Sequence, residues 1–186
     1  YGAADAENII ICMGSACEAI REVIDYEAAK GNNKLGMINV HLYRPFSEKY
    51  FFDVLPSTVK RVCVLDRTKE PGSNGEPLYL DVKDMFYGKE NQPMVIGGRY
   101  GLSSKDTTPA QMLAVFENLA AAEPKNHFTV GINDDVTFLS LPVGEEISLA
   151  KPGTFEALFF GLGADGTVGA NKNSIKIIGG STDKYC

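Results

Sequence analysis

The chain has 186 residues, of which 44% are hydrophobic, and a formal net charge of -6. This length can hold one large domain, or one domain and part of a second, around an ordinary hydrophobic core. The negative charge and the lack of any Lys/Arg run argue against nucleic acid or an anionic membrane as the main partner. No apolar stretch approaches the roughly 20 residues of a membrane span. From the charge and this length together, we expect no nucleic acid and no membrane among its partners.

The first 120 residues alternate strand-like and helical patterns. Four apolar runs are typical of strands buried in a parallel sheet, the last of them broken by Gly97-Gly98: 7–13, 35–42, 59–65 and 94–96. Helical patterns follow at about 16–30, 47–55, 78–85 and 109–119. Ser15 is expected to cap the first helix, and Thr107-Thr108-Pro109 marks the start of the last. Strands that alternate with helices predict a three-layer α/β/α sandwich with a mainly parallel sheet.

The composition changes after Ala122. Residues 123–153 carry turn signals and only brief strand-like pieces, which we interpret as an interdomain connection. A second α/β domain is expected to begin near Thr154 and to be truncated. The predicted organisation is therefore 1–122 for the first domain, 123–153 for the connection and 154–186 for the start of the second.

The ends of the sequence predict an internal piece of a longer polypeptide. Tyr1 opens the chain without an initiator Met, and Cys186 follows a segment that still has structural pattern. Natural termini usually carry a poorly ordered run instead. No signal peptide is visible in residues 1–30, although a piece of a longer chain could have lost one.

A glycine-rich turn gives the sharpest local signal. Strand-like residues 154–160 run into Gly161-Leu-Gly-Ala-Asp-Gly166, and a helical pattern with Val168, Ile175 and Ile178 follows. A strand, a glycine turn and a helix N-terminus come in the order that a phosphate cradle needs, and Lys172 adds a cation. One alternative is a structural turn, whose glycines serve packing alone. Another is a dinucleotide-binding oxidoreductase, whose acidic ribose-binding residue would lie beyond the end of the sequence.

The remaining polar residues favour structural roles. Residues 65–72 and 98–102 both follow strands, at the edge where open α/β sheets bind ligands, but their spacing favours ordinary loop contacts. His41 and His127 are isolated, and Ser15 and Ser73 lack the context of a nucleophile. The cysteines match neither a CxxC redox motif nor a metal site, and we expect them to be reduced, buried thiols: Cys12, Cys17, Cys63 and Cys186. We therefore predict no catalytic residue and no metal ligand.

Three segments resemble the pyruvate:ferredoxin (flavodoxin) oxidoreductase family: Val64–Gly72, Gly97–Pro109 and Gly161–Ile178. The resemblance covers essentially the whole chain in family order. It implies that residues 1–122 are similar to the transketolase C-terminal domain and form most of the family's second domain. Residues from 154 would begin the third domain, which is related to the γ subunit of 2-oxoacid oxidoreductases and associated with coenzyme A. By position, the implied coenzyme A contacts are Gly163, Asp165, Gly166, Thr167, Asn171 and Lys172.

The resemblance also implies the activity of the parent enzyme. The family decarboxylates pyruvate oxidatively with coenzyme A, forms acetyl-CoA and CO₂, and passes electrons to ferredoxin or flavodoxin. Thiamine diphosphate and [4Fe–4S] clusters would be bound outside this chain, by other domains of a homodimeric parent in the cytoplasm or in an anaerobic organelle of a protist. Two alternatives stay open, a related 2-oxoacid oxidoreductase and a non-catalytic interdomain assembly module.

Overall fold

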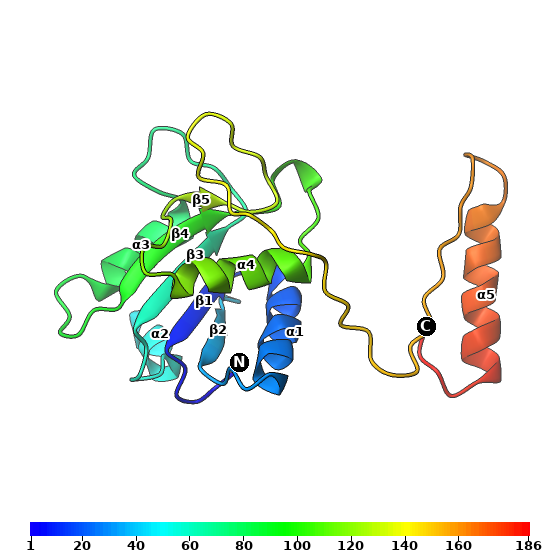
Figure 1. Cartoon of the computed structure of the whole chain (residues 1–186), viewed down its shortest axis with the longest axis horizontal. Coiled ribbons are helices and arrows are strands. Elements are labelled where there is room, and N and C mark those ends of the chain that lie inside the picture. The colour runs from blue at the N-terminus through cyan, green and yellow to red at the C-terminus, as the bar shows by residue number, and fades with distance from the viewer. The chain divides into compact units, whose positions relative to one another are not determined.

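A computed structural model describes all 186 residues and divides them into two compact units, Tyr1–Leu149 and Ala150–Cys186. The first unit is built on a five-stranded sheet in the order β2-β1-β3-β4-β5, in which all named strand pairs are parallel (Figure 1). The strands are β1 (Asn8–Cys12), β2 (Leu35–Asn39), β3 (Arg61–Asp66), β4 (Met94–Arg99) and β5 (Phe128–Thr129). The prediction of an α/β fold with a mainly parallel sheet is confirmed.

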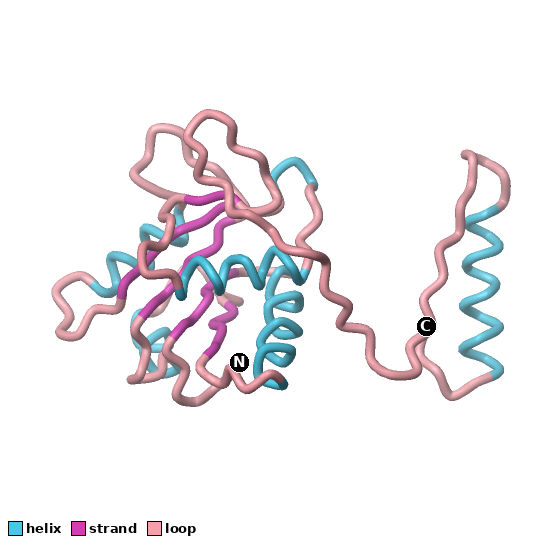
Figure 2. The backbone as a smooth tube through the Cα atoms, viewed as in Figure 1, coloured by secondary structure: helices cyan, strands magenta, loops and turns pink.

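Four helices cover the two faces of this sheet (Figure 2). They are α1 (Ala16–Ala29), α2 (Glu48–Val54), α3 (Pro77–Phe86) and α4 (Pro109–Ala120), and a 3₁₀ turn spans Leu102–Ser104. Alternate residues of β1 face opposite layers: Ile10 and Cys12 join the cluster that holds α1 and α4, whereas Ile9 and Ile11 join the cluster that holds α2 and α3. Because both faces are covered, the strands are apolar at nearly every position, which is why they are visible in the sequence.

The helix starts were predicted with mixed success. Thr108 caps α4 as expected, since its hydroxyl oxygen accepts a hydrogen bond from the Gln111 N–H at 3.4 Å and Pro109 opens the helix. The predicted Ser15 cap is wrong, because Ser15 has a helical backbone (φ -66°, ψ -21°) and its side chain makes no cap bond. The chain instead turns at Gly14, whose φ of +75° lets its carbonyl oxygen accept from the Cys17 N–H at 3.1 Å.

The predicted break at Gly97-Gly98 is also wrong, since β4 runs through both glycines to Arg99. The glycines serve close packing on opposite faces. A β-carbon on Gly97 would lie 2.7 Å from Cδ2 of Tyr79, a residue of α3. Strands tolerate glycine where another group approaches the backbone closely. Here the Tyr79 ring approaches Gly97 and the Phe128 ring approaches Gly98.

The two-residue strand β5 lies within the stretch that the sequence suggests is a connection. Phe128, Val130 and Leu141 are buried in the core of the first unit, to which residues 123–149 belong. Alongside β5, Oδ1 of Asn126 accepts a hydrogen bond from the Gly97 N–H at 2.8 Å. The predicted domain limits at 122, 123–153 and 154 stay a prediction.

The second unit contains one helix, α5 (Thr167–Ser181), which follows the glycine turn as expected. The strand predicted at 154–160 is wrong, because these residues form an extended coil with exposed side chains. A strand needs a neighbour to pair with its backbone groups, and residues 150–186 contain none. No side chain of α5 is buried. No helix in the chain combines the length and the hydropathy of a membrane crossing.

Candidate functional site

The glycine turn leads directly into the N-terminus of α5. Gly163 and Gly166 have left-handed backbones, with φ of +79° and +88°, and Gly166 is the residue that precedes the helix. Gly161 is restricted in another way, since a β-carbon there would meet the Thr167 hydroxyl at 2.6 Å. A side chain at any of these positions would strain or block the turn, so its conformation explains why glycine recurs.

Asp165 closes this turn with its carboxylate. Its Oδ2 accepts a hydrogen bond from the Leu162 N–H at 2.8 Å, and its Oδ1 accepts from the Thr167 N–H at 3.0 Å. Hydrogen bonds from the Thr167 side chain and backbone, together with the one from Leu162, lower the pKa of Asp165 to about 2. The Thr167 hydroxyl also lies 3.4 Å from the Phe160 carbonyl oxygen; it has one proton to donate, and the carboxylate is the stronger acceptor. Asp165 therefore already satisfies the first N–H of the helix.

The next donors on α5 are free. The N–H groups of Val168 and Gly169 donate to no acceptor in the chain, whereas the Ala170 N–H bonds the Gly166 carbonyl oxygen at 3.0 Å. The side chains of Asn171 and Lys172 make no hydrogen bond or ion pair, and Lys172 is exposed. Two free N–H groups, the positive end of the helix dipole and one ammonium group can bind a phosphate.

The predicted residues thus form two groups. Gly163, Asp165, Gly166 and Thr167 lie together in one closed turn, and Asn171 with Lys172 follows on the helix. Asp165 is a poor direct contact for a polyanion, because its charge has the same sign. Its hydrogen bonds assign it to shaping the turn instead.

A second polar cluster lies at the carboxyl ends of β3 and β4, where the two segments noted in the sequence come together. Asp66, only 3% exposed, ends β3, and its carboxylate accepts hydrogen bonds from the N–H groups of Leu78 at 3.0 Å and Tyr79 at 3.1 Å. Burial raises the pKa of Asp66, although these two bonds act in the opposite direction. Arg67 donates from Nε to the Gly101 carbonyl oxygen at 3.0 Å. Asp66 and Arg67 therefore hold a helix start and a loop in place, in agreement with the structural interpretation.

Sequence reasoning missed an ion pair beside this cluster. Glu76 Oε1 lies 3.1 Å from Nη1 of Arg99, and the Glu76 side chain is 4% exposed. Its second oxygen, Oε2, is buried without a hydrogen-bond partner. The two residues are 23 positions apart, so no local spacing could reveal the pair. Charged residues are rarely fully buried unless they are paired, so the burial of Glu76, which only the structure shows, is what points to the pair.

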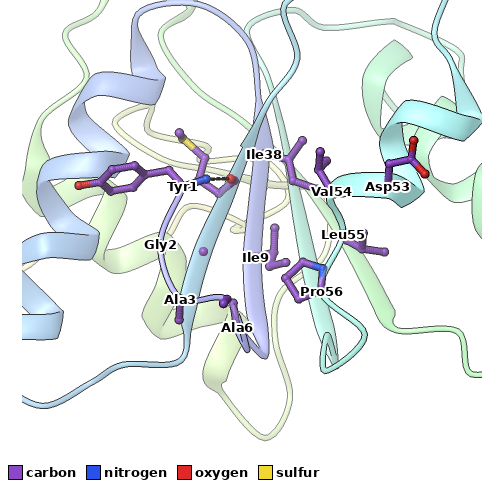
Figure 3. Close-up of a pocket in the computed structure, with 13 residues that line it drawn as sticks. Tyr1, Gly2, Ala3, Ala6, Ile9, Ile38, Asp53, Val54, Leu55 and Pro56 are labelled. Atoms are coloured by element: carbon purple, nitrogen blue, oxygen red, sulfur yellow. Dashed lines mark hydrogen bonds between the residues drawn. The ribbon is translucent and has the colours of Figure 1, made fainter.

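A cavity of about 360 Å³ lies beside the edge strand β2 (Figure 3). Its walls come from the N-terminal segment before β1, from β1 and β2, and from the end of α2: Tyr1–Ala4, Ala6, Ile9, Gly36–Ile38 and Asp53–Pro56. The Tyr1 ring points away from the other lining side chains, toward α1, where its hydroxyl bonds Asp25 (Figure 3). The Tyr1 ammonium group is also occupied, since it donates to the Met37 carbonyl oxygen at 2.9 Å. Asp53 supplies the only charged side chain, so the cavity lacks the converging polar groups of a catalytic site.

The histidines and cysteines form no metal centre, because no three His, Cys, Asp or Glu side chains come together to hold an ion. His127 packs against the Tyr79 ring at a centroid distance of 5.2 Å, a structural contact, and His41 is exposed. All cysteines are free thiols, and Cys12, Cys17 and Cys63 are buried as expected. Cys186 is exposed, so the expectation of burial is wrong for this residue.

Comparison of the sequence with known proteins identifies the family of this chain. The family described as "Pyruvate:ferredoxin oxidoreductase core domain II" matches residues 6–112. The chain is 56% identical over 186 residues to a pyruvate-flavodoxin oxidoreductase of Enterobacter agglomerans and 59% identical over 184 residues to a pyruvate:ferredoxin oxidoreductase of Moorella thermoacetica. These alignments cover 100% and 99% of this chain but only 16% of each relative. A pyruvate dehydrogenase (NADP⁺) of Cryptosporidium parvum is 53% identical over 187 residues, which cover 98% of this chain and 10% of that protein. The chain therefore belongs to the pyruvate:ferredoxin oxidoreductase family, with the core domain II of that family in its first unit.

Proposed function

We propose that the chain is part of an enzyme that decarboxylates pyruvate oxidatively with coenzyme A, yielding acetyl-CoA and CO₂ and passing electrons to ferredoxin or flavodoxin. The observation that carries this proposal is the end-to-end identity of 56% and 59% with relatives named for pyruvate and for flavodoxin or ferredoxin. Because the alignments cover 100% and 99% of this chain, no part of it is left without a counterpart in these relatives. The parallel sheet supplies a rigid scaffold, on which loops at the carboxyl edge can face other domains.

Within that enzyme we assign no catalytic residue to these 186 residues. A [4Fe–4S] cluster needs four converging thiolates, whereas Cys12, Cys17 and Cys63 are buried in the first unit and Cys186 belongs to the second. The chain does not fit the clusters, and we place them, with thiamine diphosphate, in other domains of a homodimeric parent. We propose the cytoplasm, or an anaerobic organelle of a protist, as its location.

The second unit is proposed to hold part of coenzyme A. Gly163 and Gly166 give the turn its left-handed backbone, and Asp165 and Thr167 keep it closed. The free N–H groups at the start of α5, the Asn171 amide and the Lys172 ammonium group would then bind a phosphate of coenzyme A. In this arrangement the Asp165 carboxylate shapes the turn and does not contact the phosphate.

The activity is tested with the purified full-length parent. We expect reduction of ferredoxin or flavodoxin that requires both pyruvate and coenzyme A, with one acetyl-CoA formed per pyruvate consumed. Parallel assays with other 2-oxoacids and with NADP⁺ would identify the substrate and the acceptor, because one relative is named for NADP⁺. No turnover of any 2-oxoacid would contradict the proposal.

The coenzyme A site is tested separately in the same parent. We expect Lys172→Ala to weaken coenzyme A binding by about 1–3 kcal/mol in calorimetry at low salt, the usual size of a charge-assisted contact. The KM for coenzyme A should rise while the KM for pyruvate stays constant. Lys176→Ala is the matched control, since Lys176 is exposed one turn further along α5. Unchanged affinity in a folded Lys172→Ala variant would leave the glycine turn as an assembly element.

A further inference from the structure

We propose that Cys12 and Cys17 form a reversible oxidation site, in which peroxide converts the two buried thiols into an intrachain disulfide that joins β1 to α1. Neither the family match nor the proposed activity assigns a role to these residues. The inference does not depend on the proposed function, since it concerns the first unit alone.

The geometry of the strand-to-helix turn brings the two sulfur atoms together. Cys12 is the last residue of β1 and Cys17 the second residue of α1, and their Sγ atoms lie 3.0 Å apart. A disulfide bond is about 2.05 Å long, so closure needs a shift of roughly 1 Å. Gly14, at the centre of the connecting turn, has a left-handed backbone and is exposed, and nothing lies within 4 Å of a β-carbon position there, so no other part of the chain packs on the turn at that point.

The surroundings give the two thiols different chemistry. The hydrogen bond from Cys12 is the largest effect on Cys17, and it lowers the pKa of Cys17 while raising that of Cys12. Arg21 favours the Cys17 thiolate further, whereas burial and Glu18 oppose it. Position 17 also lies in the first turn of α1, where the helix dipole stabilises a thiolate. Cys17 is therefore the nucleophile, and Cys12 remains a protonated thiol beside it.

Both steps of the reaction balance with hydrogen peroxide as the oxidant. The Cys17 thiolate attacks one oxygen of H₂O₂, a sulfur–oxygen bond forms as the O–O bond breaks, and hydroxide leaves. Cys12 sulfur then attacks the Cys17 sulfenic sulfur, the sulfur–oxygen bond breaks, and the departing hydroxide takes the Cys12 proton to become water. In sum, two thiols lose two hydrogen atoms and the peroxide becomes two waters.

The site lies where strand order reverses. The chain moves from β1 to β2 on one side and returns to β3 on the other, and open α/β sheets bind ligands at such a point. Tyr100, the residue after β4, covers this point by donating its hydroxyl proton to the Met13 carbonyl oxygen at 3.3 Å. Gly14 and Ser15 above the thiols are exposed, so a molecule as small as peroxide needs only a local opening of this turn.

Peptide mass measurement tests the proposal on the 186-residue chain. Trypsin releases residues 1–21 as one peptide, which holds Cys12, Cys17 and no other cysteine. After treatment with H₂O₂ and alkylation in denaturant, we expect this peptide to be two hydrogens lighter and to carry no alkyl group, and dithiothreitol should restore two alkylatable thiols. If the peptide keeps two free thiols while Cys186 is fully oxidised, or if Cys12 is found linked to Cys63, the proposal is overturned.

Two variants separate the roles of the thiols. In Cys12→Ser the second step is blocked, so dimedone should trap a sulfenic acid on Cys17 that is absent from the unmodified chain. Cys63→Ser is the matched control, because Cys63 is equally buried on the adjacent strand, and it should leave the disulfide unchanged. Loss of the disulfide in a folded Cys63→Ser variant, or no dimedone adduct in a folded Cys12→Ser variant, would contradict the assignment.

Discussion

The ring of Phe128 lies against the backbone of Gly98, its partner in the β4–β5 register, so closely that a β-carbon on Gly98 would come 2.2 Å from Cζ. Phe128 is fully buried, and β5 is attached to the sheet through only two residue pairs. The Phe128 ring therefore holds β5 against β4, in a space that a side chain at position 98 would fill.

We expect Gly98→Ala to lower the free energy of unfolding by about 1–3 kcal/mol, because the methyl group must displace the buried ring. Urea denaturation followed by circular dichroism measures the change. Gly144→Ala is the control, since nothing lies within 4 Å of its β-carbon position. Phe128→Leu combined with Gly98→Ala should cost less than the sum of the single changes. Equal urea midpoints for Gly98→Ala and Gly144→Ala would contradict the packing argument.

Asp66 provides a second test, at the start of α3. In Asp66→Ala the buried N–H groups of Leu78 and Tyr79 lose their acceptor, which we expect to destabilise the chain by about 1–3 kcal/mol at neutral pH. Asp66→Asn keeps one acceptor oxygen and should cost less. Thermal unfolding of the three proteins ranks them directly. An Asp66→Ala protein as stable as Asp66→Asn would show that these bonds contribute little.

The Asp165 turn should respond to pH well below the normal range of a carboxyl group. Its pKa is lowered to about 2 in the folded chain, against about 3.9 for an unperturbed Asp. The ionised carboxylate therefore stabilises the turn above the unfolded pKa, and this stabilisation is lost as pH falls through the folded value. NMR titration of the Asp165 carboxyl carbon measures the midpoint.

Thr167→Val is the matched variant for that titration. It removes the hydroxyl that makes the largest contribution to the shift while keeping the side-chain shape. We expect the Asp165 midpoint to move up toward the unperturbed value. A midpoint near 3.9 in both proteins would mean that the turn is open in solution.

Deleting residues 150–186 should leave the first unit intact. Both hydrophobic clusters lie within residues 1–149, and no residue of the second unit is buried. We expect the truncated chain to unfold cooperatively with the same midpoint as the 186-residue chain, and limited proteolysis to cut after residue 149 first. Degradation of residues 7–120 before residues 154–186 would contradict this.

Strands β1 to β4 could be predicted because each is buried on both faces and is followed by a complete helix. Strand β5 could not, since two residues are too short for a pattern and Phe128 is buried through its contact with Gly98. Residues 154–160 show the opposite failure. Their apolar pattern is that of a strand, but the structure depends on backbone partners that the sequence of this chain does not supply.

The candidate site was predictable only in part. Glycines at 163 and 166 reveal the turn, because a left-handed backbone favours glycine locally. The role of Asp165 was not visible, since it depends on which N–H groups its carboxylate reaches once the turn has closed. The buried pair of Glu76 and Arg99 joins residues that are distant in the sequence, and hydrophobic periodicity does not reveal such contacts.

The side chain of Asn126 has a consequence for the behaviour of the protein at high concentration. An edge strand with unpaired N–H groups can recruit a strand from another molecule and begin an aggregate. On β4 the Gly97 N–H is held by Asn126 Oδ1, and the Arg99 carbonyl oxygen accepts from the Val130 N–H at 3.0 Å. One amide side chain and a very short strand thus close an edge that would otherwise be open to intermolecular pairing.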